Sequence, residues 1–236
     1  MKLSVVMPVF NEVGTLEEAL GRVRNVRLPK EIIVVDDGST DGSRDLLNRL
    51  RTQIRPQDDV QNELKVIFQP FNQGKGAAIR SALSSMTGDI VIIQDADLEY
   101  DPQDYTKLLD PILAGKADVV YGTRFYGGGA HRVLFFWHYL GNQALTFFSN
   151  MLTNLNLSDM EVGYKVFRTE VLKSIDIESQ RFGFEVEVTV KVAKKKYRIY
   201  EVPISYYGRT YAEGKKITWK DGFAAFYFLV RFWLKG

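Results

Sequence analysis

Short apolar runs alternate with amphipathic segments along the first half of the chain. The runs are rich in β-branched residues and end at turn residues, which is typical of strands buried on both faces of a sheet. Between them, apolar positions recur at helical spacing. The pattern predicts strands at residues 3–9, 31–35, 64–69, 89–94 and 118–121, and helices that begin at residue 11 and cover 43–50, 76–86 and 104–114. This alternation predicts an α/β fold with a mostly parallel sheet.

The second half of the chain is less regular and richer in aromatic residues. It follows three glycines at residues 127–129. The pattern predicts one or two amphipathic helices at 133–155, strands at 164–168 and 198–206, a helix at 185–195 and a short apolar helix at 223–234. The glycines could mark a domain boundary, but Gly122-Thr123-Arg124 just before them has the character of an active-site loop. We therefore predict a single domain that spans residues 1–236.

The balanced charge narrows the classes of partner. The 236 residues are 45% hydrophobic and 25% charged with a formal net charge of +2, so we expect a globular protein without a nucleic-acid partner. The absence of cysteine excludes disulfides, thiolate zinc sites and cysteine nucleophiles. Pro8 and Asn11 end the first apolar run too early for a signal peptide, and no apolar stretch is long enough for a membrane span. We expect a cytoplasmic protein.

Carboxylates follow two of the predicted strands directly. Asp36 and Asp37 come after one strand, and Asp95 and Asp97 after another. Ligands of parallel sheets gather at the carboxyl ends of strands. Alternation places Asp95 and Asp97 on one side of the chain, where paired carboxylates suit a hard cation such as Mg²⁺ or Mn²⁺. Glu99 could supply another oxygen, and the alternative is a solvated acidic turn.

Two loops offer groups for a nucleotide. The segment after residue 35 could hold a base edge or a ribose through Asp36 or Asp37, or could be a turn and helix cap. Residues 72–76 open a helix whose backbone N–H groups, with Lys75, suit a phosphate. Taken alone, Lys75 is better interpreted as an exposed loop lysine.

Other charged residues are candidates for phosphate binding or proton transfer. Arg124, Arg209 and Lys215 could neutralise a phosphate or diphosphate, although each could also be a surface charge. Asp159 or Glu161 could act as a general base or position an acceptor, with a cap or turn as the alternative.

Four motifs in order resemble those of the family-2 inverting glycosyltransferases. They are VVMPVFNE at residues 5–12, VVDDGSTD at 34–41, NQGKG at 72–76 and QDAD at 94–97. Further motifs are similar to the polyprenyl-phosphate branch typified by dolichol-phosphate mannose synthase. These are YGTRF at 121–125, SDMEVGYKVFR at 158–168, VPISYYGR at 202–209 and EGKKI at 213–217. The resemblance covers nearly the whole chain.

The resemblance implies a GT-A fold, in which a mostly parallel, Rossmann-like nucleotide-binding sheet flanked by helices continues into an acceptor-binding half. These would be residues 1–125 and 126–220, followed by an amphipathic helix at 221–236. The resemblance places these residues around the donor: Pro8, Phe10, Glu12, Asp36, Asp37, Lys75, Asp95 and Ala96. It places Asp95 and Asp97 on Mg²⁺ or Mn²⁺, with Glu99 either a third ligand or turned away from the ion. It places Arg124 and Arg209 on the acceptor phosphate or the leaving diphosphate. Relatives often have Gln in place of Glu99, and Val162-Gly163 stands where the family has Ser-Gly.

The implied reaction moves a hexose from a nucleotide-diphosphate sugar, of the GDP-mannose or UDP-glucose type, to a polyprenyl or dolichyl phosphate. An anionic acceptor needs no strong base. A soluble or glycan hydroxyl acceptor would need one, supplied by Asp159 or Glu161. A non-catalytic nucleotide-sugar-binding protein is a third possibility.

A polyprenyl phosphate lies in a bilayer, so the resemblance implies peripheral attachment at the cytoplasmic membrane face. The apolar segments 133–152 and 223–234 could be interfacial helices, with Trp137 and Tyr139 at the headgroup level. The alternative for both segments is packing in the core or in a homo-oligomer.

Overall fold

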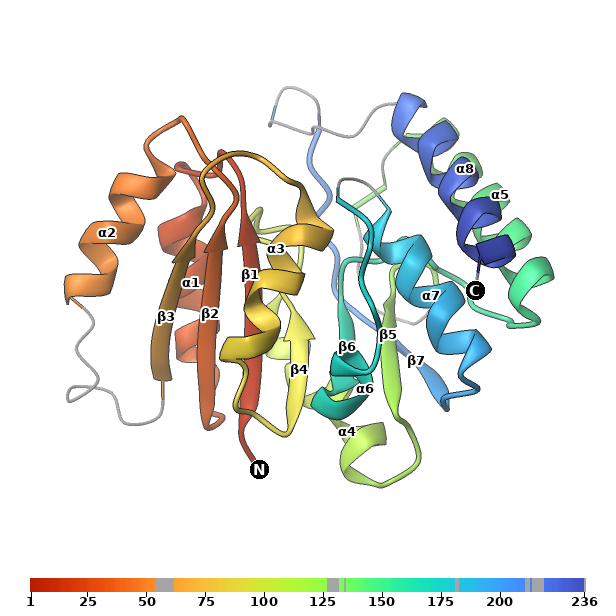
Figure 1. Cartoon of the computed structure of the whole chain (residues 1–236), viewed down its shortest axis with the longest axis horizontal. Helices are drawn as coiled ribbons and strands as arrows, with labels where there is room; N and C mark the ends of the chain where they lie inside the picture. Colours follow the sequence, from red (N-terminus) through yellow and green to blue (C-terminus); the bar gives the residue numbers. More distant parts are fainter. Residues whose placement is uncertain are drawn as a thin grey trace.

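A seven-stranded sheet organises the chain in the computed structural model, which describes residues 1–53, 62–126, 132–133, 135–180, 183–210, 213 and 219–235 (Figure 1). The strand order is β3-β2-β1-β4-β6-β5-β7. The strands are β1 (Leu3–Val9), β2 (Lys30–Asp36), β3 (Asn62–Phe68), β4 (Ile90–Ile93), β5 (Val119–Thr123), β6 (Lys165–Arg168) and β7 (Ile199–Pro203). Only β6 among these strands runs antiparallel to its neighbours, β4 and β5. The expected mostly parallel α/β sheet is confirmed.

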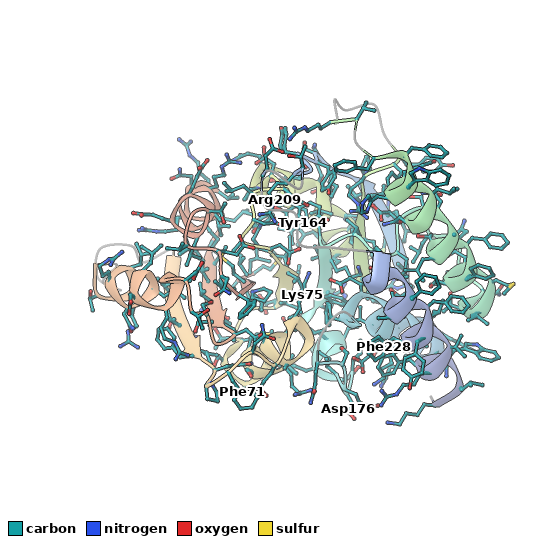
Figure 2. All side chains as sticks on the ribbon, turned by 90° about the horizontal axis from the view of Figure 1, so that it is seen from above. Phe71, Lys75, Tyr164, Asp176, Arg209 and Phe228 are labelled. Carbon is teal, nitrogen blue, oxygen red and sulfur yellow. The ribbon has the colours of Figure 1, made fainter. Side chains whose placement is uncertain are left out.

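Helices cover both faces of this sheet. They are α1 (Leu16–Asn25), α2 (Ser43–Gln53), α3 (Lys75–Ala82), α4 (Tyr105–Leu113), α5 (Phe136–Thr153), α6 (Thr169–Lys173), α7 (Phe184–Lys194) and α8 (Trp219–Lys235), with short 3₁₀ helices at Leu83–Ser85 and Pro102–Asp104. The two views place α1 and α4 on one face of the sheet and α3 and α7 on the other, while α5 and α8 lie side by side next to α7 (Figures 1 and 2). None of the helices in the described ranges is long and apolar enough to cross a membrane.

The apolar runs of the sequence form the strands that lie in the hydrophobic core. Every residue of β2, β4 and β5 is buried, as a sheet covered by helices on both faces requires. The register sets β1 between β2 and β4, with Val5 beside Ile32 and Ile92. The carboxyl ends of these parallel strands therefore meet at one edge of the sheet, which is the upper edge in Figure 1.

The predicted elements are observed with shifted bounds. The helix expected from Asn11 begins only at Leu16, because Asn11 has a left-handed backbone (φ 54°) and residues 10–14 form a loop. The helix expected to reach residue 86 ends at Ala82 and continues as a 3₁₀ turn. Helix α6 was not predicted. The glycines 127–129 lie outside the described residues, and the division of the chain into two halves remains a prediction, although β1–β4 and β5–β7 share one sheet.

Candidate active site at the carboxyl edge of the sheet

Two loops after β1 and β2 are fastened to each other at this edge. Backbone N–H groups of one loop donate hydrogen bonds to side-chain oxygens of the other. The bonds run from Asn11 N to Ser39 Oγ (3.0 Å), Glu12 N to Ser43 Oγ (3.0 Å), Val13 N to Asp41 Oδ2 (3.0 Å) and Thr40 N to Asn11 Oδ1 (2.8 Å). The polar residues of the two motifs therefore build a cross-linked double loop. Pro8 is the last but one residue of β1, and Phe10, directly after this strand, is 38% exposed.

Asp36 and Asp37 both point into the protein. Asp36 is fully buried and forms an ion pair with Arg44 at 3.0 Å. The two carboxylate oxygens of Asp37 accept hydrogen bonds from the backbone N–H groups of Gln73 and Gly74, each at 2.7 Å. Burial raises the pKa of Asp37. Asp37 thus fastens the end of β2 to the loop that precedes α3, and its contact with a base or ribose remains a prediction.

Lys75, at the start of α3, bridges two carboxylates. Its Nζ lies 2.8 Å from Asp95 Oδ1 and 2.8 Å from Glu185 Oε1, and its side chain is 23% exposed. Burial lowers the pKa of Lys75, but the charges of Asp95 and Glu185 outweigh burial and raise it. The alternative of an exposed loop lysine is therefore wrong. In Figure 2 Lys75 lies near the middle of the molecule, between the two ends of the sheet.

Gly163 presses against the other oxygen of Asp95. A Cβ atom at Gly163 would lie 2.3 Å from Asp95 Oδ2 and 2.8 Å from the ring of Tyr100. Such distances leave no room for a side chain. The Asp95 carboxylate is thus held between Lys75 on one side and the Gly163 backbone on the other.

Arg209 gathers the remaining carboxylates. Its guanidinium lies 3.0 Å from Asp97 Oδ2, 3.2 Å from Glu99 Oε1 and 3.7 Å from Glu12 Oε2. The Tyr206 hydroxyl donates to the second Glu99 oxygen at 3.0 Å. Burial raises the pKa of Asp97 to about 7, with the charges of Asp95 and Glu99 adding to the effect and Arg209 opposing it. The cluster is therefore short of positive charge.

This shortage fits a divalent cation. Asp95 and Asp97 offer hard oxygen ligands, and burial together with the charges of Asp95 and Glu99 raises the pKa of Asp97, which disfavours its anionic form when no further cation is near. Glu99 is engaged by Arg209 and Tyr206 through both oxygens. Within the part of the chain that the structure describes, no three His, Cys, Asp or Glu side chains are arranged to hold a metal ion. The residues that fit the cation are Asp95 and Asp97, with Ala96 buried between them.

A second cationic group, Arg124, directly follows β5. Arg124 donates to Asp159 through Nε at 2.6 Å, through Nη2 at 2.7 Å and through its backbone N–H at 3.1 Å. Asp159 is fully buried, and the backbone N–H groups of Ser158 and Asp159 donate to Glu201 on β7. Asp159 therefore holds Arg124, and both of its oxygens are engaged.

Two further charged residues, Glu161 and Lys165, follow Asp159 in the sequence, and Lys165 is the first residue of β6. Glu161 Oε1 is buried and has no hydrogen-bond partner among the described residues. Burial, with the charge of Glu185 adding to it, raises the pKa of Glu161 to about 7. Burial lowers the pKa of Lys165 to about 8, and its Nζ donates to the carbonyls of Met160 and Val162. Glu161 is the carboxyl group of the site that is least engaged.

Sequence reasoning missed Glu185 and Glu201, and Lys215 lies outside the described residues. Glu185 stands in the first turn of α7, where an acidic residue commonly complements the helix dipole. In the sequence, the available signal was its place between the apolar residues Phe184 and Val186.

The sheet order and the carboxylates at its carboxyl edge define an α/β protein with a candidate ligand site at that edge. Residues 4–176 match the model of glycosyl transferase family 2. The chain is 30% identical over 227 residues to an undecaprenyl-phosphate mannosyltransferase of Micrococcus luteus, covering 91% of this chain and 87% of that protein. It is 30% identical to a polyprenol monophosphomannose synthase of Mycolicibacterium smegmatis, covering 86% and 76%.

Among solved structures, glucosyl-3-phosphoglycerate synthase of Mycobacterium tuberculosis is similar, with a TM-score of 0.73 and 20% identity over 98% of this chain and 79% of that one. The chain belongs to glycosyl transferase family 2 and has the GT-A fold. The expected family, fold and enzyme class are confirmed.

Proposed function

We propose that this enzyme transfers a hexose, with inversion, from a nucleotide-diphosphate sugar of the GDP-mannose or UDP-glucose type to a polyprenyl phosphate, using Mg²⁺ or Mn²⁺. The observation that carries the proposal is Arg124, a cation that is 14% exposed and held by a bidentate bond to the fully buried Asp159. The two relatives whose names specify undecaprenyl phosphate and polyprenol support it over most of the chain.

On the donor side, Asp95 and Asp97 would hold the cation. The bound cation would stabilise the negative charge of the departing nucleoside diphosphate. Lys75 and Gly163 keep Asp95 in place, and the double loop after β1 and β2 would enclose the nucleoside. The solved relative with Mn²⁺ and UDP-glucose bound supports a divalent cation on this fold.

On the acceptor side, the arginines favour a ligand that is already anionic. The guanidiniums of Arg124 and Arg209 present donor groups that suit phosphate oxygens. Asp159 accepts three hydrogen bonds from Arg124 and is committed to that role. A phosphate acceptor is ionised near neutral pH, so its oxygen can attack the anomeric carbon without a general base.

A hydroxyl acceptor is the second candidate, and Glu161 favours it. Its unpartnered oxygen and its pKa of about 7 are the properties of a general base that works near neutral pH. In this alternative Glu161 would take the proton of a sugar or glycan hydroxyl as the bond to the anomeric carbon forms.

An acceptor screen separates the two candidates. Radiolabelled GDP-mannose or UDP-glucose is supplied with Mn²⁺ to short polyprenyl phosphates and, in parallel, to the matching polyprenols and to glycans. We expect label on the phosphates alone and little effect of Glu161→Gln. Transfer to hydroxyl acceptors that is lost in Glu161→Gln would overturn the proposal. Thermal shifts with each donor, with and without Mn²⁺, would identify the base and the sugar.

We further propose that the enzyme acts at the cytoplasmic face of a membrane as a peripheral protein, because its acceptor is anchored in a bilayer. Homo-oligomerisation remains a prediction.

A further inference from the structure

Large apolar side chains are exposed along two neighbouring helices, α5 and α8. Seven of them are at least three-fifths exposed, which is unusual for side chains of this size on the surface of a soluble protein. They are Phe136 (65%), Trp137 (77%), Phe147 (64%), Met151 (61%), Phe223 (72%), Tyr227 (62%) and Leu234 (71%). The rings of Phe148 on α5 and Phe226 on α8 meet at 5.4 Å, so the two helices present one continuous surface, which we name the α5–α8 face.

The α5–α8 face is distinct from the buried sides by which the two helices pack against the rest of the protein. Ala225, Leu229 and Phe232 form the buried stripe that seats α8 on the protein, and Leu145, Thr146 and Ser149 do the same for α5. The exposed rings therefore belong to a second apolar stripe on each helix. Residues 136–153 contain no Asp, Glu, Lys or Arg, so α5 has no charged side chain that would keep its outer surface in water.

Unpaired cations border the face at the end of α8. Arg231 is exposed and lines a cavity of about 410 Å³ together with Ser179, Gln180, Phe228 and Phe232. Glu178 also lines the cavity, but its oxygens are paired with Lys191 and Lys235. Phe228 and Asp176 mark this region in Figure 2.

Basic residues continue from this cavity onto α7. Lys194 Nζ donates to the carbonyls of Phe232 and Trp233, which brings the end of α7 beside the end of α8. Lys195 and Lys196 follow and are exposed. Among the described residues, Arg231, Lys195 and Lys196 have no carboxylate partner.

We propose that the α5–α8 face docks on an anionic lipid bilayer, with the aromatic side chains in the headgroup region and the Arg231 cavity receiving a lipid phosphate. The inference deepens the proposed function and rests on it for the presence of a membrane-bound acceptor. Aromatic rings suit the headgroup level, and cations beside them add attraction to anionic lipids.

Charge distinguishes a bilayer from a second copy of this chain. A symmetric dimer through this face would bring basic groups together with few carboxylates to pair them, whereas lipid phosphates supply the missing negative charge. The exposed aromatic side chains also extend along both helices, and a bilayer offers all of them an apolar environment, whereas a few contacts with a second copy would cover only some.

Vesicle co-flotation of the full chain tests the proposal. The vesicles are phosphatidylcholine alone or mixed with phosphatidylglycerol, and the variants are Trp137→Ser/Phe147→Ser/Phe223→Ser and Arg231→Glu. Leu113→Ser on α4, also exposed at 55% but away from this face, is the matched control. We expect the triple variant to bind both vesicle types at least about tenfold less and Arg231→Glu to lose only the preference for the anionic vesicles. The control should bind as the unaltered protein does.

Two further measurements keep the outcome decisive. Thermal unfolding checks that the variants are folded. We expect them to be, because the replaced side chains lie outside the core. Transfer to a short water-soluble polyprenyl phosphate should be unchanged in all variants; if the unaltered protein does not catalyse that transfer, the proposed function fails while the vesicle result still stands. Unchanged vesicle binding by the triple variant would overturn the proposal. It would also be overturned if light scattering showed the unaltered protein and the other variants as dimers and the triple variant as a monomer.

Discussion

Replacing Asp159 with asparagine tests whether this carboxylate holds Arg124 or accepts a proton. The chain contains a matched pair of such contacts. Arg124 and Asp159 are joined through the backbone N–H, Nε and Nη2 at 3.1, 2.6 and 2.7 Å, and Arg198 and Asp118 through the same three groups at 3.0, 2.9 and 2.7 Å. The pairs differ in burial: Asp159 is fully buried and Arg124 is 14% exposed, whereas Arg198 is 53% exposed.

Burial sets the expected magnitude. Asparagine keeps the shape of Asp159 but turns an N–H₂ group toward the guanidinium and leaves that cation without a buried counter-charge. Breaking a buried pair from one side costs about 3–5 kcal/mol of the free energy of unfolding. For Asp118→Asn, solvent replaces the lost contact, and we expect only a small fraction of that loss.

Urea unfolding of the two variants gives the comparison, and transfer activity is measured on the same samples. We expect Asp159→Asn to lose stability and activity together, and the double variant Asp159→Asn/Arg124→Gln to recover part of the stability because the unpaired charge is gone. A general base would behave differently. Full stability with transfer lost, and with the acid limb of the pH–rate profile removed, would refute the positioning role of Asp159.

Three more substitutions follow from the site and the core. Asp97→Ala should abolish transfer in a radiolabel assay, and near-normal activity would contradict the cation assignment. Gly163→Ala would place a Cβ atom 2.3 Å from Asp95 Oδ2, so we expect transfer to fall about 100-fold and the Mn²⁺ requirement in a titration to rise; an unchanged titration would count against it. Burial raises the pKa of Glu31, but hydrogen bonds, the largest from Lys65, outweigh it and lower the pKa from 4.5 to about 2. The free energy of unfolding should therefore fall as pH drops from 4.5 toward 2, and Glu31→Gln should flatten that part of the profile.

The sequence predicts the strands and the carboxyl edge well because both depend on local patterns. Apolar runs identify β1, β2 and β4, and parallel strands bring the residues after them together whatever the rest of the chain does. Asp95 and Lys75 are 20 positions apart in the sequence. Asp95 follows β4 and Lys75 begins α3, and both of these ends lie at the carboxyl edge, so the sequence pattern already places the two residues near each other; their contact is 2.8 Å.

Contacts from the second half of the chain were not predictable in the same way. Glu185 reaches Lys75 from α7, and Glu201 holds Ser158 from β7, so both depend on how distant segments pack. Glu161 stands in a loop pattern that suggests a turn, and only its packing shows a buried oxygen without a partner. The roles of Asp37 and Asp159 were likewise hidden, since a carboxylate that binds a ligand and one that fastens a loop look alike in sequence.

Charge balance joins these residues into one account of the site. Five carboxylates, those of Glu12, Asp95, Asp97, Glu99 and Glu185, surround two cations, Lys75 and Arg209. Burial raises the pKa of Asp97, and the charges of Asp95 and Glu99 add to the rise, so that one proton relieves part of the repulsion. A divalent cation with a donor diphosphate would relieve it without a proton, and it would compete with Arg209 for Asp97. Arg209 would then keep its bond to Glu99 while its Asp97-facing N–H groups turn to phosphate oxygens. Glu99 therefore serves the site best as the residue that keeps Arg209 at the edge, which is the role that its present contacts show.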